Sequence, residues 1–495
     1  MIYQTIAWLV LSFLVGFVIY LFPKLSRVLS LMTGIVSAVY AVQVFFDNSS
    51  LDLQLLDSFG VSLTVDRLSS FFILTNALVT CAVIIYCWQN IKDKFFYMQL
   101  IILHGSVNAT FVCADFISLY VALEVISIGS FLLIAYSRTD RSIWVGLRYL
   151  FVSNVAMLFY LVGTILVYKA HNSFSYEGLR GSPPEAIALI FLGLLVKGGI
   201  FVSGLWLPLT HSESASYVSA MLSGVVVKAG VFPLVRCALL LEEIDPIVKI
   251  LGGATAIFGV SFAIWQQDTK RTLAFSTISQ LGFVMAAPSV GGFYALTHGL
   301  AKSTLFLTAG NLPSRNFQEL ARKKIDISVW LVLLAASLSI SGFPILSGFA
   351  AKVSTSKEWV LWQTIVMNIA TVGTVMTFAK FIFLPKQKLS SFNRRGVEGN
   401  QAKSKIHPGY WWAMLILLSG LIAANILYYE AYTIENTIKP LAIIALGWLA
   451  YLLVIKKLTI KLPRDLEQFD HLIGVMIVTL IFIFWIIWTR TQFLI

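Results

Sequence analysis

The chain alternates between long apolar stretches and short polar segments. Apolar windows of about 20 residues, the length that crosses a bilayer core, recur along the sequence. They predict sixteen membrane spans, at residues 4–22, 28–46, 67–88, 96–113, 115–136, 144–168, 186–208, 217–241, 247–265, 272–288, 290–312, 327–355, 360–384, 410–430, 436–455 and 470–489. The longest polar gap is too short for a soluble domain. The pattern therefore predicts an all-α polytopic membrane protein with about 14–16 transmembrane helices.

Composition supports this prediction. Of the 495 residues, 58% are hydrophobic and 12% are charged, against about 45–50% and about 25% in a soluble protein. The first apolar segment has no basic region before it and no small-residue cleavage site after it, so we expect a membrane span rather than a signal peptide. The four cysteines, which lie in apolar stretches without metal-ligand spacing, are expected to serve packing: Cys81, Cys87, Cys113 and Cys237.

The formal charge of +12 is spread over many short loops, so nucleic acid is not expected as a partner. If the sixteen spans alternate, 22 Lys and Arg residues lie in the loops after odd-numbered spans, and 5 lie on the opposite side. The positive-inside rule then puts both termini outside the cytoplasm. Asp268, Lys270 and Arg271 are expected to set this topology and to form a cytoplasmic contact.

The spans suggest five regions. These are N-terminal helices (1–95), a first half with spans four to eight plus span nine (96–265), the rest of a second half (266–384), a basic cytoplasmic loop (385–409) and C-terminal helices (410–495).

Glycine and proline interrupt two spans at corresponding places. Span seven contains Gly198, Gly199 and Pro208, and span twelve contains Gly342 and Pro344. Five spans in each half would make the second half enter the membrane from the other side, which predicts two inverted five-helix repeats with broken helices. The alternative is that glycine and proline are simply commoner in membrane helices than in soluble ones.

Several ionisable residues lie deep within predicted spans, where each charge costs about 2.5–3.5 kcal/mol even on lenient scales. The candidate functional residues are Glu124 in span five, Lys197 in span seven, Lys228 in span eight, His298 and Lys302 in span eleven, and Lys352 in span twelve.

These residue types suit a proton relay. Burial weakens a lysine's hold on its proton and a nearby carboxylate strengthens it, so Glu124 is a candidate partner of Lys197. His298 and Lys302 lie four residues apart on one helix face, and histidine titrates near neutrality. Purely structural ion pairs, and a histidine that serves only packing, remain the alternatives.

Other charges are expected near span ends. Arg148, Arg236 and Lys380 are expected to reach towards the membrane surface. Asp66 and Arg67 open span three and suggest an interfacial ion pair.

Motifs for cofactor chemistry are absent from the sequence. There is no Walker phosphate loop, no dinucleotide-binding fingerprint, and no H-E-x-x-H or C-x-x-C motif. We therefore expect no cofactor, no metal and no redox site in this chain, which makes a transporter subunit the expectation rather than an enzyme. A membrane-embedded transferase would need an acid or histidine cluster at a membrane face, and none is visible.

Six segments together resemble the antiporter-like subunit family, which includes proton-pumping membrane subunits of respiratory complex I and large subunits of Mrp-type cation/proton antiporters. The segments are ALEVISIGSFLL, LVKGGIFVSGLWLPLTHSE, VSAMLSGVVVKAGVFPLVR, QDTKRTLAFSTISQLGFVMAA, ALTHGLAKSTLFLTAG and SGFPILSGFAAK. The resemblance implies two inverted five-helix bundles, a pair between Glu124 and Lys197, and hydrated half-channels joined by a central line of lysine and histidine. Leu209 departs from the family pattern after W-L-P, which puts the cytoplasmic mouth of the first half-channel in doubt.

The resemblance implies a proton-translocating subunit of a multi-subunit cation/proton antiporter, with Na⁺ as the expected cation. Lys352 favours the D-type subunit of Mrp antiporters, because subunit 4 of complex I typically has glutamate there. The alternative is a subunit 4-like proton pump of an NAD(P)H or ferredoxin:quinone oxidoreductase. Expected partners are other membrane subunits, protons and the lipid bilayer, in a bacterial plasma membrane.

Overall fold

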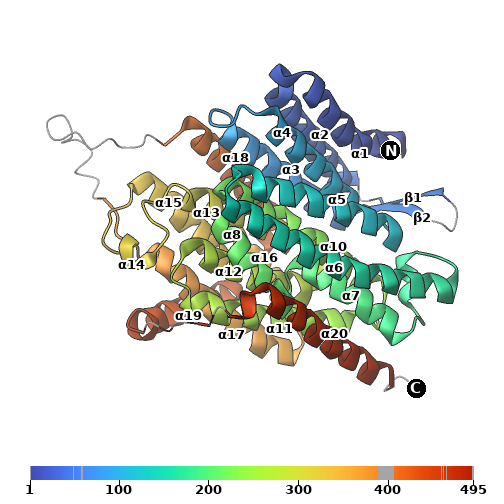
Figure 1. Cartoon of the computed structure of the whole chain (residues 1–495). Coiled ribbons are helices and arrows are strands. Elements are labelled where there is room, and N and C mark those ends of the chain that lie inside the picture. The colour runs from blue at the N-terminus through green and yellow to red at the C-terminus, as the bar shows by residue number, and fades with distance from the viewer. Residues whose placement is uncertain are drawn as a thin grey trace.

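The computed structural model describes residues 2–47, 49–56, 60–387, 406–458, 460, 462–463 and 465–492. Figure 1 shows the helices packed into one bundle, with the hairpin β1–β2 at its edge near the N-terminus. The helices are α1 (Ile2–Leu21), α2 (Ser26–Asp47), α3 (Arg67–Cys87), α4 (Lys94–Thr110), α5 (Phe116–Ile134), α6 (Asp140–His171), α7 (Pro184–Gly198), α8 (Trp206–Glu213), α9 (Ser216–Met221), α10 (Lys228–Leu240), α11 (Asp245–Trp265), α12 (Thr269–Ala286), α13 (Gly291–Ala309), α14 (Phe317–Leu320), α15 (Ile327–Ser341), α16 (Ser347–Lys357), α17 (Leu361–Ile382), α18 (Pro408–Leu427), α19 (Ile434–Ala450) and α20 (Phe469–Gln492). Most of the predicted basic loop, residues 388–405, lies outside the described residues.

Every predicted span is occupied by helix, which confirms an all-helical multi-pass membrane protein. Within the described residues, 12 helical stretches are long and apolar enough to cross a membrane, or 13 if the bent pair α12–α13 is one span. The other predicted spans fall on α4, which has 17 residues, on α12 and α13, and on α15 with α16. The helices α12 and α13 qualify only together, and they meet at an angle of 108°.

A two-stranded antiparallel hairpin, which the span pattern did not predict, lies between the second and third predicted spans. Strand β1 (Leu51–Leu56) pairs with β2 (Gly60–Val65), with Leu53 opposite Leu63. The alternation of apolar and polar residues in LDLQLL is the strand signal that was missed. The backbone N–H of Ser62 donates to the Asp115 carboxylate at 2.8 Å, which fastens the hairpin to the start of α5.

Aspartate side chains begin several of the spans. The carboxylates of Asp66, Asp115 and Asp268 accept hydrogen bonds from backbone N–H groups three residues later, at 2.7–2.9 Å. These bonds satisfy donors that a helix start leaves free. Asp66 also pairs with Arg236 of α10, whereas Arg67 lies over the Phe45 ring at 4.8 Å, so the predicted Asp66–Arg67 ion pair is wrong.

Two spans are broken where the glycines predicted it. The helix α7 ends at Gly199, with φ +63°, and continues through the short helix η4 (Phe201–Leu205) into α8. In the same way α15 ends at Gly342, with φ +83°, and α16 follows. A third irregularity was not predicted: the π-helix η5 (Leu222–Val226) joins α9 to α10 just before Lys228.

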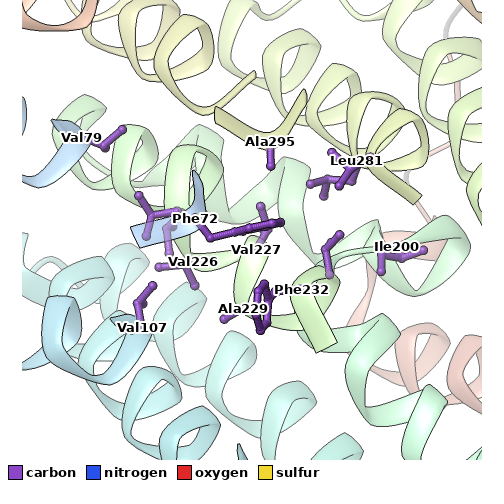
Figure 2. Close-up of a cluster of buried hydrophobic side chains, with 14 of the residues drawn as sticks. Phe72, Val79, Val107, Ile200, Val226, Val227, Ala229, Phe232, Leu281 and Ala295 are labelled. Carbon is purple, nitrogen blue, oxygen red and sulfur yellow. The ribbon is translucent and has the colours of Figure 1, made fainter. Parts of the chain in front are cut away.

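The centre of the bundle lies around η5 and α10. The segment Ser216–Leu240 is buried along its whole apolar window. Figure 2 shows Phe72, Val226, Val227 and Phe232 packed in this apolar core, with further residues from α4, α12 and α13. Large apolar residues on α1, α2, α19 and α20 are exposed, as expected of helices that face lipid.

Candidate functional site

Lys197 lies at the end of α7, two residues before the break at Gly199, and its side chain is only 5% exposed. Its ammonium donates a hydrogen bond to the Leu123 carbonyl of α5 at 2.9 Å and another to the Ser127 hydroxyl. The break thus brings Lys197 against the carbonyl and hydroxyl groups of α5.

Glu124 lies next to this contact on α5. Its side chain is partly buried, and its Oε1 has no hydrogen-bond partner among the described residues. The charges of Glu124 and Lys197 act on each other, but no ion pair within 4.0 Å joins them in the described part of the chain. The expected proximity is present, without the expected direct ion pair.

Lys228 is fully buried at the start of α10, where η5 approaches α13. Its ammonium donates to the carbonyls of Gly224 at 2.6 Å and Ser223 at 3.3 Å. A Cβ on Gly224 would overlap the Ser303 hydroxyl, and a Cβ on Gly299 would lie 3.4 Å from the Lys228 Cε. A Cβ on Gly299 would also lie 2.9 Å from the Gly224 carbonyl, so the missing side chains at these two glycines let η5 pack closely against α13 beside Lys228.

Lys302 of α13 is also fully buried. Its ammonium donates to the Leu273 carbonyl of α12 at 3.0 Å and to the Ser276 hydroxyl, and it lies 5.1 Å from the centre of the Phe378 ring. This is the arrangement of Lys197, a lysine bonded to a carbonyl and to a serine about one turn later on a neighbouring helix. The acceptors of these hydrogen bonds lie on α5 and α12. These are the second helices of the two predicted five-span repeats.

His298 lies one turn before Lys302 and is 3% exposed. Both ring nitrogens lack a hydrogen-bond partner in the described part of the chain, and the charges of Lys228 and Lys302 act on the ring. A cavity of about 10 Å³, room for one water, adjoins His298. Its walls are Gln280, Tyr294, Thr297, His298, Ser339, Ile340 and Gly348, so it connects α13 to the break between α15 and α16.

Lys352 lies on α16, across that break, with 8% of its surface exposed. Its ammonium donates to the Ser341 carbonyl at 3.3 Å, and it lies 5.3 Å from the centre of the Phe283 ring. A cavity of about 160 Å³ adjoins it.

His211 of α8 was missed, although it lies within a segment that carried the family resemblance. Its side chain is fully buried, it stacks on Phe306 at 4.7 Å, and neither ring nitrogen has a partner among the described residues. The charges of Lys270 and Lys302 act on it. A titratable residue inside a broken span is the signal that could have identified it.

Three cations expected near the membrane surface are buried instead. Lys380 donates to the last carbonyls of α11, at Ala263 and Gln266. Arg236 pairs with Asp66, and Arg148 donates to the Glu467 carbonyl. Their exposures of 7%, 7% and 3% contradict the prediction that they reach out of the protein, because internal acceptors hold each of them.

The fold and the site define a polytopic membrane protein with buried lysines and histidines in two broken-helix halves, in which Lys228, Lys302 and His298 act on one another by charge. Residues 113–377 match the family described as NADH:quinone oxidoreductase/Mrp antiporter, TM. This match covers more than half of the chain, and the chain belongs to that family.

The relatives of this chain include subunits of cation/proton antiporters and of quinone oxidoreductases. The chain is 27% identical over 384 residues to the D subunit of the Na(+)/H(+) antiporter of Alkalihalophilus pseudofirmus, covering 70% of this chain and 78% of that protein. It is 29% identical over 383 residues to NAD(P)H-quinone oxidoreductase chain 4 1 of Synechococcus elongatus, covering 68% and 71% respectively.

A solved structure confirms the fold. A chain of the Mrp complex from Dietzia sp. superposes with a TM-score of 0.75 at 21% identity, covering 96% of this chain and 59% of that one. A chain of an archaeal membrane-bound sulfane sulfur reductase gives a TM-score of 0.72 at 18% identity, covering 90% of this chain and all of that one.

Proposed function

We propose that this chain is the proton-translocating membrane subunit of a multi-subunit cation/proton antiporter, with Na⁺ as the expected cation. The observation that carries the proposal is a set of buried basic groups, here called the row: Lys197, Lys228, Lys302, His298 and Lys352. Intramembrane ionisable residues are costly and mark ion or proton pathways in membrane proteins.

Within this row, Lys228, Lys302 and His298 are coupled by charge. Protonated neighbours repel each other in a medium that screens weakly, so a proton arriving at Lys228 favours release from Lys302 or His298. Glu124 acts in the opposite sense on Lys197, because its carboxylate stabilises the ammonium form. His211 extends the row from Lys302 towards Lys270.

The partners are proposed from the relatives. Two of them are named as a subunit or a chain of a larger assembly, and both solved structures are of membrane complexes. We propose that this chain functions with other membrane subunits, in a bacterial plasma membrane.

The test is Na⁺-dependent proton movement in vesicles that contain the chain with its neighbouring subunits. Lys197→Ala and Glu124→Ala are expected to abolish it while the complex still assembles. Lys249→Ala serves as the control, because Lys249 forms a partly exposed ion pair with Asp245 away from the row. Normal Na⁺/H⁺ exchange in both Lys197→Ala and Glu124→Ala would overturn the proposal.

The second candidate is a proton-pumping subunit of an NAD(P)H or ferredoxin:quinone oxidoreductase, favoured by the similarity to the Synechococcus elongatus chain. It predicts proton movement that depends on quinone reduction and not on a Na⁺ gradient. The same vesicles distinguish the two, because a Na⁺ gradient alone drives proton movement only in the antiporter.

A further inference from the structure

The cavity beside Lys352 has one wall made by a helix outside both halves. Three polar residues from the first turns of α19 line it: Glu435, Asn436 and Lys439. The helix α19 packs on α17 of the second half, and its later turns are apolar. The charged residues of this helix are therefore gathered at the cavity.

The opposite wall is the broken span of the second half with its neighbour α17. It consists of Ser341, Gly342, Lys352, Val353, Ser356, Trp359, Asn368 and Thr371. Ser341, Ser356, Asn368 and Thr371 bring hydroxyl and amide groups to this wall, and a volume of about 160 Å³ has room for several waters. Both walls of the cavity thus carry polar groups, next to apolar residues such as Val353, Trp359 and Ile443.

The cavity joins a buried group to an exposed one. Lys352 is 8% exposed, whereas Glu435 and Lys439 are both exposed, and all three line the same space. Pro440, also in the wall, has no N–H, so the carbonyl of Asn436 one turn earlier lacks its usual helical donor. This leaves a further acceptor at the cavity.

We propose that the first turns of α19 form the outer mouth of the path at Lys352, and that Glu435 is the group that exchanges protons between Lys352 and the surrounding water. The proposal rests on the proposed function. In each step an N–H bond of the Lys352 ammonium breaks and an O–H bond forms on a water, which passes a proton to the Glu435 carboxylate. Lys352 is left as the neutral amine, and the neutral Glu435 acid then releases its proton outside.

Water access tests the mouth without relying on transport. Asn436→Cys, in vesicles with the full complex, is expected to react with a membrane-impermeant maleimide in one vesicle orientation only. The control is Ile438→Cys, two residues along the same helix, at a position that is 63% exposed and apolar, as expected of a lipid-facing residue. The native cysteines are all buried, so their background is low.

The labelling outcome decides the proposal. A rate at Asn436→Cys at least about tenfold above that at Ile438→Cys supports it, since accessible thiolate sets the rate. Equal, slow labelling at both positions contradicts the proposed mouth, because it shows that lipid or a neighbouring subunit fills the space beside Asn436. This result is independent of transport by Lys197→Ala and Glu124→Ala: normal exchange in both would overturn the proposed function without changing the labelling at Asn436→Cys.

Glu435→Gln tests the carboxylate itself. It is expected to lower ion-coupled proton movement about tenfold, while Glu435→Asp retains most of it. Glu430→Gln is the matched control, because Glu430 is an exposed acid of the same connection that does not line the cavity. Unchanged transport in Glu435→Gln overturns its role in proton exchange.

Discussion

Lys197 and Lys302 are each held by one backbone carbonyl and one serine hydroxyl. A hydroxyl can accept a hydrogen bond from an ammonium and donate one to a neutral amine. Ser127 and Ser276 can therefore bond to either protonation state of their lysine. A carboxylate at the same place would favour the charged form alone, which explains why a relay benefits from having Glu124 near the contact but not in it.

Lys302→Arg tests whether this switching is needed. Arginine keeps its charge at any physiological pH, so the variant is expected to lose at least about tenfold in ion-coupled proton movement. The measurement is proton movement in vesicles, with assembly of the complex followed in parallel. Wild-type transport would show that Lys302 needs only to be charged, as in a structural role.

Asp66, just before α3, gives a pH dependence of stability. Burial raises the pKa of this carboxyl, but the hydrogen bonds and charge of Arg236 outweigh burial and hold the pKa below its usual value. A depressed pKa contributes stability above the unfolded value, about 3.9, and this contribution is lost as the pH falls through the folded value. The melting temperature in detergent is therefore expected to fall below about pH 4.

Asp66→Asn is expected to remove part of that acid sensitivity and to cost about 1–3 kcal/mol at neutral pH, since it leaves Arg236 poorly paired. The control is Asp245→Asn, which breaks a partly exposed pair with Lys249 and should cost at most about 1 kcal/mol. An unchanged acid profile in Asp66→Asn would contradict the assignment.

The sequence predicted the buried positions of Lys197, Lys228, Lys302 and Lys352, because a mid-span charge is visible in one dimension. It misjudged Arg148, Arg236 and Lys380 because their acceptors are distant in the chain: Glu467, Asp66 and the end of α11. Only the fold brings such pairs together.

At the scale of elements, the helix breaks between α7 and α8 and between α15 and α16 position Lys197 and Lys352 of the proposed proton path. Gly342 has φ +83°, and a Cβ there would lie 2.8 Å from the Lys352 Cδ. The glycine therefore serves both the turn and the close approach of Lys352. These breaks were predictable, because glycine and proline mark them in the sequence.

Gly342→Ala is expected to displace Lys352, to cost about 1–3 kcal/mol through the strained backbone and to lower transport. The measurements are the melting temperature and vesicle transport of the same preparation. Gly474→Ala in α20 is the matched control, because a Cβ there meets nothing within 4 Å. Equal behaviour of the two variants would show that the break tolerates a side chain.

The π-helix η5 and the hairpin β1–β2 illustrate what the sequence did not predict. The segment LSGVV has no proline and a single glycine, Gly224, which packs closely against α13. Such π-helical turns are rare and are frequently found at functional sites. The hairpin does have a local signal, the alternation of apolar and polar residues in LDLQLL, but its strands are too short to form an apolar window of about 20 residues.

At the scale of the whole molecule, the C-terminal segment joins the two halves. The helix α19 packs on α17 of the second half, whereas α20 packs on α7 and η4 of the first. Between them the short helix η10 (Asp465–Glu467) places Glu467 in a buried ion pair with Arg271 of α12, and its carbonyl accepts from Arg148 of α6. One acid thus connects α12 to α6 at the predicted cytoplasmic side.

Glu467→Gln tests whether this contact holds the halves together. Removing one partner of a buried ion pair leaves the other charge uncompensated, at a cost of about 3–5 kcal/mol. A clear fall in melting temperature is therefore expected. A lower yield of cross-links between cysteines placed on α7 and α20 is also expected, because α20 would be held less firmly against α7. Glu430→Gln, an exposed acid of the same C-terminal region, should change neither. If Glu467→Gln keeps both properties, α20 is anchored by its apolar contacts alone, and the pair with Arg271 is dispensable for the assembly of the two halves.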